Sequence, residues 1–198
     1  MGLTPVAPGM LAAVVTSLEM TAPPPSAPGA TAKADSPLTL VRIESSAPHD
    51  YRALFRLVGA DWLWFSRLVL DDDALGAIID DPAVEIYAVR DAAGADVGML
   101  ELDFREGANA ELAFLGLVSG LTRQGHGRWL MNRALALLWR PGVSRVWVHS
   151  CTLDHPGAIA FYRASGFTAF ARALETFADP RLTGHLPRDA APQVPIIA

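Results

Sequence analysis

One stretch of the chain, residues 111–131, constrains the fold more than any other. It begins with ELAFLGLV, an almost unbroken apolar run that is typical of a strand buried on both faces of a sheet. A short turn that contains Gly125 and Gly127 follows, and apolar residues then recur at helical spacing from Leu130 onward. The stretch therefore predicts a strand, a glycine-bearing turn and a helix.

The start of this helix has the features of an anion-binding site. The first N–H groups of a helix have no acceptor within it and favour a negatively charged group such as a diphosphate. Gly125 and Gly127 carry no side chain that would block a ligand, and Arg123 and Arg128 add positive charge. The alternative is a plain helix start in which the glycines only make room for packing. The sequence has neither the Lys-Ser/Thr pair of a P-loop nor the Gly-x-Gly-x-x-Gly spacing of a dinucleotide site.

Length and charge narrow the range of partners. The 198 residues suffice for one domain with a full core. A net charge of −5 argues against nucleic acid as a partner and suits a cationic partner or substrate. The single cysteine, Cys151, excludes an internal disulfide, no apolar run reaches membrane-spanning length, and no basic residue precedes the short N-terminal apolar run. We therefore expect a cytoplasmic protein without a membrane partner.

The two ends of the chain differ in composition from its middle. Residues 1–37 comprise an apolar, β-branched segment at 10–20, which predicts an extra strand, and a Pro/Ala-rich linker at 22–37. The extra strand would join this domain or form a contact in a homodimer, and a poorly ordered leader is the alternative. Residues 179–198 are expected to form a Pro-rich tail. The folded domain is therefore expected to span residues 38–178.

The pattern between these ends predicts a mixed α/β fold. Strands are expected at 38–43, 84–90, 97–105, 111–118, 144–151 and 167–177, and helices at 47–57, 72–79, 127–139 and 157–165. With the N-terminal segment, the order is two strands, two helices, three strands, and then helix, strand, helix and strand. The strands on either side of the third helix are expected to be parallel, and the earlier strands antiparallel.

Two separated motifs resemble the GNAT superfamily of acetyl-CoA-dependent N-acyltransferases, in a bacterial branch of unknown substrate. The first is the strand end at 115–117 followed by Gly125-x-Gly127 at the helix start, which resembles the family's acetyl-CoA pyrophosphate loop. The second is AIAFYRASGF at 158–167, which is similar to the family's A-x-x-x-Y-x-x-x-G-F helix and strand. The resemblance covers roughly residues 38–178.

The resemblance implies a mostly antiparallel sheet of six to seven strands, flanked by helices. In it the strand from Glu111 bulges and splays from the strand that begins at Ser144. The pantetheine arm of acetyl-CoA would lie in the gap, and its pyrophosphate would bind the backbone amides of the glycine turn. The implied cosubstrate-binding residues are Leu115, Leu117, Arg123, Gln124, Gly125, His126, Gly127, Arg128 and His155.

Two positions depart from the family pattern. Thr122 stands where the family often has Gln or Arg, so the anion site would depend on its backbone amides, with Arg123 and Gln124 beside them. His155 stands where the family often has Asn, and it would contact CoA or face the substrate.

Acetyl transfer from a thioester to an amine needs a base for the amine proton and a proton for the leaving thiolate. The resemblance implies Tyr162 as the acid and Glu111 as the base, directly or through a water, with the pKa of Glu111 raised by partial burial. Glu101 and Asp103, on the neighbouring strand, compete as bases or bind a cationic amine. In the alternative interpretation Tyr162 only closes the core, and the three acidic residues lie on solvated strand faces.

A cluster of polar residues follows at the end of strand 144–151. It contains His149, Cys151, Asp154 and His155. Either histidine is an alternative base, because the charge of an imidazole changes near neutral pH. The spacing does not match a structural zinc pattern, so we expect no metal. Cys151 as a nucleophile that carries the acyl group is a minor alternative, since GNAT-like transfer is usually direct.

An aromatic segment completes the set of candidates. The segment contains Trp62, Trp64 and Phe65, which either wall a substrate cleft or pack in the core. The candidate substrate-binding residues are Trp62, Trp64, Glu101 and His149. The sequence thus predicts an N-acetyltransferase that uses acetyl-CoA on the primary amine of a small molecule. Two alternatives remain open: a CoA-binding regulatory domain without catalysis, and an acetyltransferase for lysines or N-termini of proteins and peptides.

Overall fold

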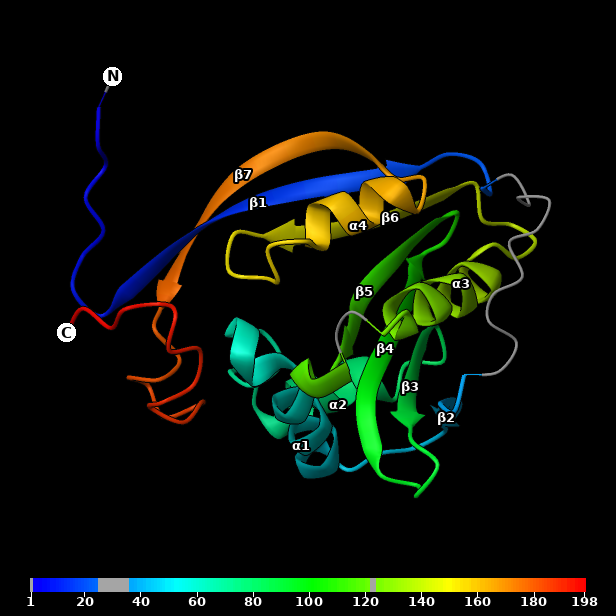
Figure 1. Ribbon diagram of the computed structural model, residues 1–198, viewed down its shortest axis with the longest axis horizontal. Helices are drawn as coiled ribbons and strands as arrows, with labels where there is room; N and C mark the ends of the chain where they lie inside the picture. Colours follow the sequence, from blue (N-terminus) through cyan, green and yellow to red (C-terminus); the bar gives the residue numbers. More distant parts are fainter. Residues whose placement is uncertain (1, 25–35, 122–123) are drawn as a thin grey trace.

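The computed structural model describes residues 2–24, 36–121 and 124–198 (Figure 1). Its strands are β1 (Met10–Met20), β2 (Thr39–Ile43), β3 (Val84–Arg90), β4 (Asp96–Glu106), β5 (Asn109–Leu117), β6 (Arg145–Cys151) and β7 (Thr168–Ala178). Its α-helices are α1 (Pro48–Gly59), α2 (Asp72–Ile79), α3 (His126–Leu138) and α4 (Ala158–Ala164). Short 3₁₀ turns span Ala60–Trp62 and Ser119–Leu121. The predicted order of strands and helices is confirmed.

The strands form one seven-stranded sheet in the order β2-β3-β4-β5-β6-β1-β7. The neighbours β2 to β5 pair antiparallel, as do β6, β1 and β7. β5 and β6 pair in parallel, because α3 carries the chain back to the same end of the sheet. The prediction of a mixed, mostly antiparallel sheet flanked by helices is therefore confirmed.

β1 lies inside the sheet rather than at its edge. It pairs antiparallel with β6 on one side and with β7 on the other, and in Figure 1 β1 and β7 form a long curved pair. Its residues Ala13, Leu18 and Met20 are buried. Residues 10–20 thus belong to the folded unit, which begins well before residue 38. Residues 25–35 of the expected linker lie outside the described residues.

Each face of the sheet is covered by its own helices. Side chains of neighbouring strand residues point to opposite faces, so Tyr87 and Val89 of β3 pack with α3 and α4, while Ile86 and Ala88 pack with α1 and α2. The N-terminus of α2 is capped by Asp71, whose carboxylate accepts a hydrogen bond from the Ala74 N–H at 2.8 Å. No helix of the described residues is long and apolar enough to cross a membrane.

The C-terminal segment 179–198 packs against the domain. The Arg181 side chain is 1% exposed and pairs with Asp179 at 2.7 Å. The Arg181 Nη1 donates to the carbonyl oxygens of Ala190, Ala191 and Val194, so one guanidinium ties the two ends of the segment together. The expected tail is therefore part of the fold, since a buried ion pair and a buried set of carbonyl acceptors tie it down.

Candidate active site

A cavity opens where β5 and β6 separate. The two strands pair from the start of β5 only as far as Glu111 and then diverge. One extra residue on β5, Ala113, forms a bulge opposite Glu101 and Leu102 of β4 and bends the strand at this point. The cavity beyond the bulge measures about 380 Å³, and its walls come from β5, β6, β7, α4 and residues 62–66. The bulge and the splay that the resemblance implies are both present.

The glycine turn lies at one end of this cavity. Gly125 is the N-cap of α3, and its φ of 86° falls in the left-handed region that favours glycine. Gly127 lines the cavity, and a Cβ at this position would meet the Phe161 ring of α4 at 3.9 Å. The N–H groups of His126, Gly127 and Arg128 lie in the first turn, where a helix has no acceptor of its own. They are placed to bind an anion.

The residues around this turn differ in how they contribute. The Gln124 side-chain amide donates to the Gly120 carbonyl at 3.0 Å, so it braces the turn. The Arg128 side chain extends from an exposed position on the helix. Thr122 and Arg123 lie outside the described residues. Of the features expected at the anion site, the structure therefore describes the backbone of the first helical turn and Arg128.

β5 forms the wall of the cavity next to this turn. Leu115 and Leu117 both line the cavity, in the position that the sequence prediction gave them. Past Glu111, the edge of β5 that faces β6 pairs with no strand in the described part of the chain. An extended acyl chain with amide groups fits such an edge, because the backbone can pair with it as with a short strand.

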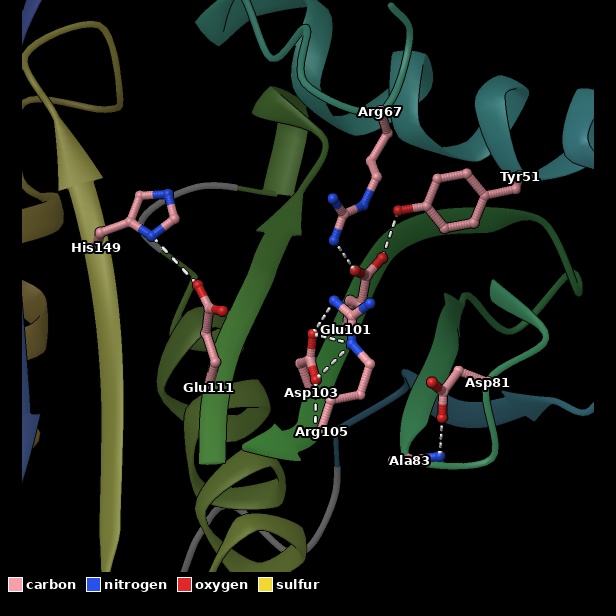
Figure 2. A network of polar contacts seen from close by, with 9 residues as sticks. All are labelled: Tyr51, Arg67, Asp81, Ala83, Glu101, Asp103, Arg105, Glu111 and His149. Atoms are coloured by element: carbon pink, nitrogen blue, oxygen red, sulfur yellow. Dashed lines mark hydrogen bonds and ion pairs between the residues drawn. The ribbon is translucent and has the colours of Figure 1, made fainter. Parts of the chain in front are cut away.

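Glu111 and His149 meet across the point where the strands diverge (Figure 2). The His149 Nδ1 lies 3.3 Å from the Glu111 Oε1. This hydrogen bond raises the pKa of His149 above the ordinary histidine value, and the Glu111 charge adds to the rise against the effect of burial. His149 lines the cavity while Glu111 lies behind it. The two predicted bases thus form a pair in which the imidazole is nearer to a substrate.

Tyr162 of α4 presents a buried phenol to the cavity. The residue is 8% exposed, packs against Phe161 and Phe167, and lines the cavity. Burial raises the pKa of its hydroxyl, and the negative charge of Asp154 raises it further. The raised pKa keeps the hydroxyl neutral. Because it makes no hydrogen bond to any described residue, it can donate to a group in the cavity.

The aromatic segment 62–65 both packs in the core and walls the cavity. Trp64 fits against Gly59, where a Cβ would lie 2.5 Å from the Trp64 Cβ and 2.6 Å from the indole ring, and the Trp64 Nε1 donates to Asp154 at 3.1 Å. Trp62 contacts the His155 ring edge-on at a centroid distance of 5.3 Å. The segment therefore connects the end of α1 to the loop after β6.

Glu101 and Asp103 are buried and do not lie on solvated strand faces, so the alternative interpretation is wrong for these two residues. Glu101 is 0% exposed; it accepts a hydrogen bond from the Tyr51 hydroxyl and pairs with Arg67 at 2.7 Å (Figure 2). Asp103 is 8% exposed and is held by the Arg105 side chain. Neither residue lines the cavity. Both oxygens of Glu101 are occupied by side chains of the protein, so it is not placed to bind a substrate or take its proton.

The cluster at the end of β6 reaches the cavity with all four of its polar residues: His149, Cys151, Asp154 and His155. Burial raises the pKa of the Cys151 thiol to about 11, with a further rise from the Asp154 charge, so the neutral thiol is a poor nucleophile. The Gly157 N–H donates to His155 Nδ1 at 3.0 Å, which fixes this ring beside the start of α4. Among the described residues, no three His, Cys, Asp or Glu side chains are grouped as a metal site.

Several residues of the cavity wall were not among the sequence candidates, and Val15, Ser66, Glu175 and Phe177 are four of them. Glu175 and Phe177 are two positions apart on β7 and so share one face of the strand. That alternation is visible in the sequence. What the sequence did not show is that β1 brings β7 alongside β6, which turns this face toward the cavity.

Comparisons with known proteins agree with this geometry. Residues 51–167 match the model of the acetyltransferase (GNAT) family. No curated protein sequence matches the chain. The fold is similar to that of an aminoglycoside acetyltransferase from an uncultured soil metagenomic sample, crystallised with sisomicin (TM-score 0.54, 20% identity, 69% of this chain and 91% of that chain). It is also similar to a dodecameric spermidine N-acetyltransferase from Vibrio cholerae (TM-score 0.52, 20% identity, 75% of this chain and 97% of that chain).

A further similar structure is a functionally unknown conserved protein from Staphylococcus epidermidis (TM-score 0.56, 12% identity). The similarity covers 86% of this chain and 63% of that protein, so the chain spans less than two thirds of its length. At these identities the similarity shows a shared fold.

Proposed function

Because the chain belongs to the acetyltransferase (GNAT) family, whose model matches residues 51–167, we propose that it transfers an acetyl group from acetyl-CoA to the primary amine of a small molecule. The observation that carries the proposal is the cavity between β5 and β6, which has an anion-binding helix start at one end and His149 and Tyr162 on its walls. The names of two similar structures, an aminoglycoside and a spermidine acetyltransferase, also point to small-molecule amines.

The residues around the gap fit acetyl-CoA. The first turn of α3 would hold the pyrophosphate through its backbone N–H groups, and the open edge of β5 at Leu115 and Leu117 would pair with the pantetheine arm. When bound, acetyl-CoA supplies the thioester acyl group. The polar ends of this site and its apolar middle match a cosubstrate with a charged head and a long neutral arm.

His149 and Glu111 would remove the proton of the amine. An alkylammonium cannot attack a carbonyl carbon, so a base has to accept its proton first. The Glu111 carboxylate holds His149 through Nδ1, which leaves Nε2 as the proton acceptor on the cavity side. Glu111, the leading base in the sequence analysis, is thereby assigned to positioning, and the histidine to the proton transfer.

Tyr162 would donate a proton to the thiolate that leaves. A thiolate is a strong acceptor, and the buried phenol remains protonated because burial raises its pKa. The hydroxyl has no partner among the described residues that would compete for its proton. His149 on β6 would then accept the proton of the amine, and Tyr162 on α4 would donate a proton to the thiolate. Both residues line the same cavity.

The acetyl-CoA site is tested at Gly127. Gly127→Glu should abolish acetyl-CoA binding in calorimetric titration, because it places a carboxylate at the helix start that would hold the pyrophosphate. Gly127→Ala is the matched control, since its Cβ meets only the Phe161 ring, at an ordinary 3.9 Å. Equal affinities in the glutamate variant and the wild type would remove α3 from the binding site.

The catalytic assignment is tested at Tyr162 by thiol release in the presence of an amine panel. Tyr162→Phe should lower kcat by about 10²-fold, the lower end for loss of an acid catalyst, and leave acetyl-CoA affinity unchanged. Equal kcat in the two proteins would remove the hydroxyl from the mechanism. Acetyl-CoA binding without turnover of any amine would favour a regulatory CoA-binding domain instead.

A further inference from the structure

We propose that the amine acceptor is a monocation with an apolar aliphatic or aromatic body, and that Glu175 binds its ammonium group. This inference rests on the proposed acetyl transfer and adds the class of substrate. It is carried by three features of the cavity: the charges on its walls, the state of its carboxylates, and the rings opposite the strand β7.

The charged residues on the wall favour a cation. Two carboxylates, Asp154 and Glu175, line the cavity, and a third, Glu111, lies behind His149. No arginine or lysine is among the described residues that line it. Away from the helix start of α3, an acceptor with a carboxylate or phosphate would meet no positively charged side chain of the described residues, which costs free energy where the group loses water.

One of these carboxylates is uncommitted. Asp154 uses one oxygen for the Trp64 indole N–H and the other for the Ser150 hydroxyl and the Cys151 N–H. Glu111 is engaged with the base. Glu175 makes no hydrogen bond or ion pair with any described residue, so it alone has both oxygens available.

Glu175 lines the same cavity as the proposed base. Although the Glu111 hydrogen bond is the main cause of the raised pKa of His149, the negative charge of Glu175 contributes to the same rise. It likewise contributes to the raised pKa of Cys151. An ammonium group bound by Glu175 would therefore lie in the same cavity as the imidazole that accepts its proton.

The rest of the acceptor region is apolar. Phe177, two residues after Glu175 on β7, stacks on Phe65 at a centroid distance of 4.1 Å and an interplanar angle of 15°. Trp62 and Val15 complete this wall. An alkyl or aryl body is stabilised by burial against such rings. A second ammonium group on the same molecule would lie among these rings with no carboxylate to pair with.

The test uses the purified full chain with saturating acetyl-CoA and two matched pairs of amines. Hexylamine and 1,6-diaminohexane share a chain and differ by one ammonium, while 2-phenylethylamine and phenylalanine differ by one carboxylate. We expect kcat/KM to be higher by at least about tenfold for hexylamine and for 2-phenylethylamine than for their partners. A factor of this size corresponds to the loss of one charge-assisted hydrogen bond.

Glu175→Gln should raise KM for hexylamine by about 10- to 100-fold, with a much smaller change in kcat and none in acetyl-CoA affinity. Glu175→Asp, which keeps the charge, should recover part of the loss. Glu106→Gln is the matched control, because Glu106 is an exposed glutamate at the end of β4 and lies outside the cavity.

The possible results separate this inference from the function on which it rests. Faster acetylation of the diamine than of hexylamine, or an unchanged KM in Glu175→Gln, would overturn the monocation assignment and leave the acetyl transfer standing. Acetylation of none of the four amines, with acetyl-CoA still bound, would overturn the proposed function and the inference with it.

Discussion

Glu101 and Glu111 are glutamates on neighbouring strands, and the structure places them in opposite environments (Figure 2). Glu101 on β4 lies under α1 with no exposed surface, and the Tyr51 hydroxyl and the Arg67 guanidinium occupy its two oxygens. Glu111 on β5 is 20% exposed at the side chain and has one partner, the imidazole of His149. From their sequence contexts both were candidate bases.

The difference shows what distinguishes a structural carboxylate from one that serves a reaction. A buried carboxylate with two strong donors contributes to folding, because its removal would leave the Arg67 guanidinium without its buried partner. A carboxylate whose single partner is a titratable imidazole instead adjusts the proton affinity of that partner. The contacts of Glu101 therefore stabilise the folded state, whereas the contact of Glu111 raises the pKa of His149.

The largest effect is expected from breaking the buried site. Glu101→Ala should lower the free energy of unfolding by about 3–5 kcal/mol, because it leaves the Arg67 cation without its buried partner. Urea unfolding followed by circular dichroism measures this change. Glu111→Ala is the matched control and should cost about 1 kcal/mol or less, since a partly exposed pair contributes little. Equal losses in the two variants would contradict the contrast between the two glutamates.

The next largest effect is expected on catalysis. His149→Gln should lower kcat/KM by at least about 100-fold, or about 2.7 kcal/mol in activation free energy, because it removes the base while keeping a polar side chain. The comparison variant is Glu111→Gln, which keeps the imidazole and should lose only about tenfold, the effect of one charge-assisted hydrogen bond. A larger loss in Glu111→Gln than in His149→Gln would make Glu111 the base.

The smallest effect is a shift of the pH profile. In the proposed mechanism the neutral imidazole is the base, so kcat/KM should rise with pH through the pKa of His149, which Glu111 raises above the ordinary value. Glu111→Gln removes the hydrogen-bonding carboxylate and should move the acidic limb to lower pH. The limb is measured as kcat/KM from pH 5 to 9 with an amine in excess. Disappearance of the limb in this variant, rather than its displacement, would identify Glu111 as the group that titrates.

The sequence predicted the order of elements because that order follows from local patterns, whereas the position of the cavity was implied by the family resemblance. The apolar run before Gly125, the helical spacing after it and the motif around Tyr162 each involve residues close in the chain. The state of Glu101 was missed for a related reason. Its alternation with Leu100 and Leu102 is also the pattern of a strand with one solvated face, and the sequence does not show that a helix covers that face.

The sequence by itself determined the secondary structure, the glycine-bearing helix start and the polar cluster after β6. Tertiary structure alone decided that β1 inserts between β6 and β7, and that Glu175 and Phe177 thereby face the cavity. The physical reason is range: side-chain periodicity and helix capping depend on neighbours along the chain. The choice of a strand partner instead depends on which distant segments bury each other's apolar faces and pair their backbone groups.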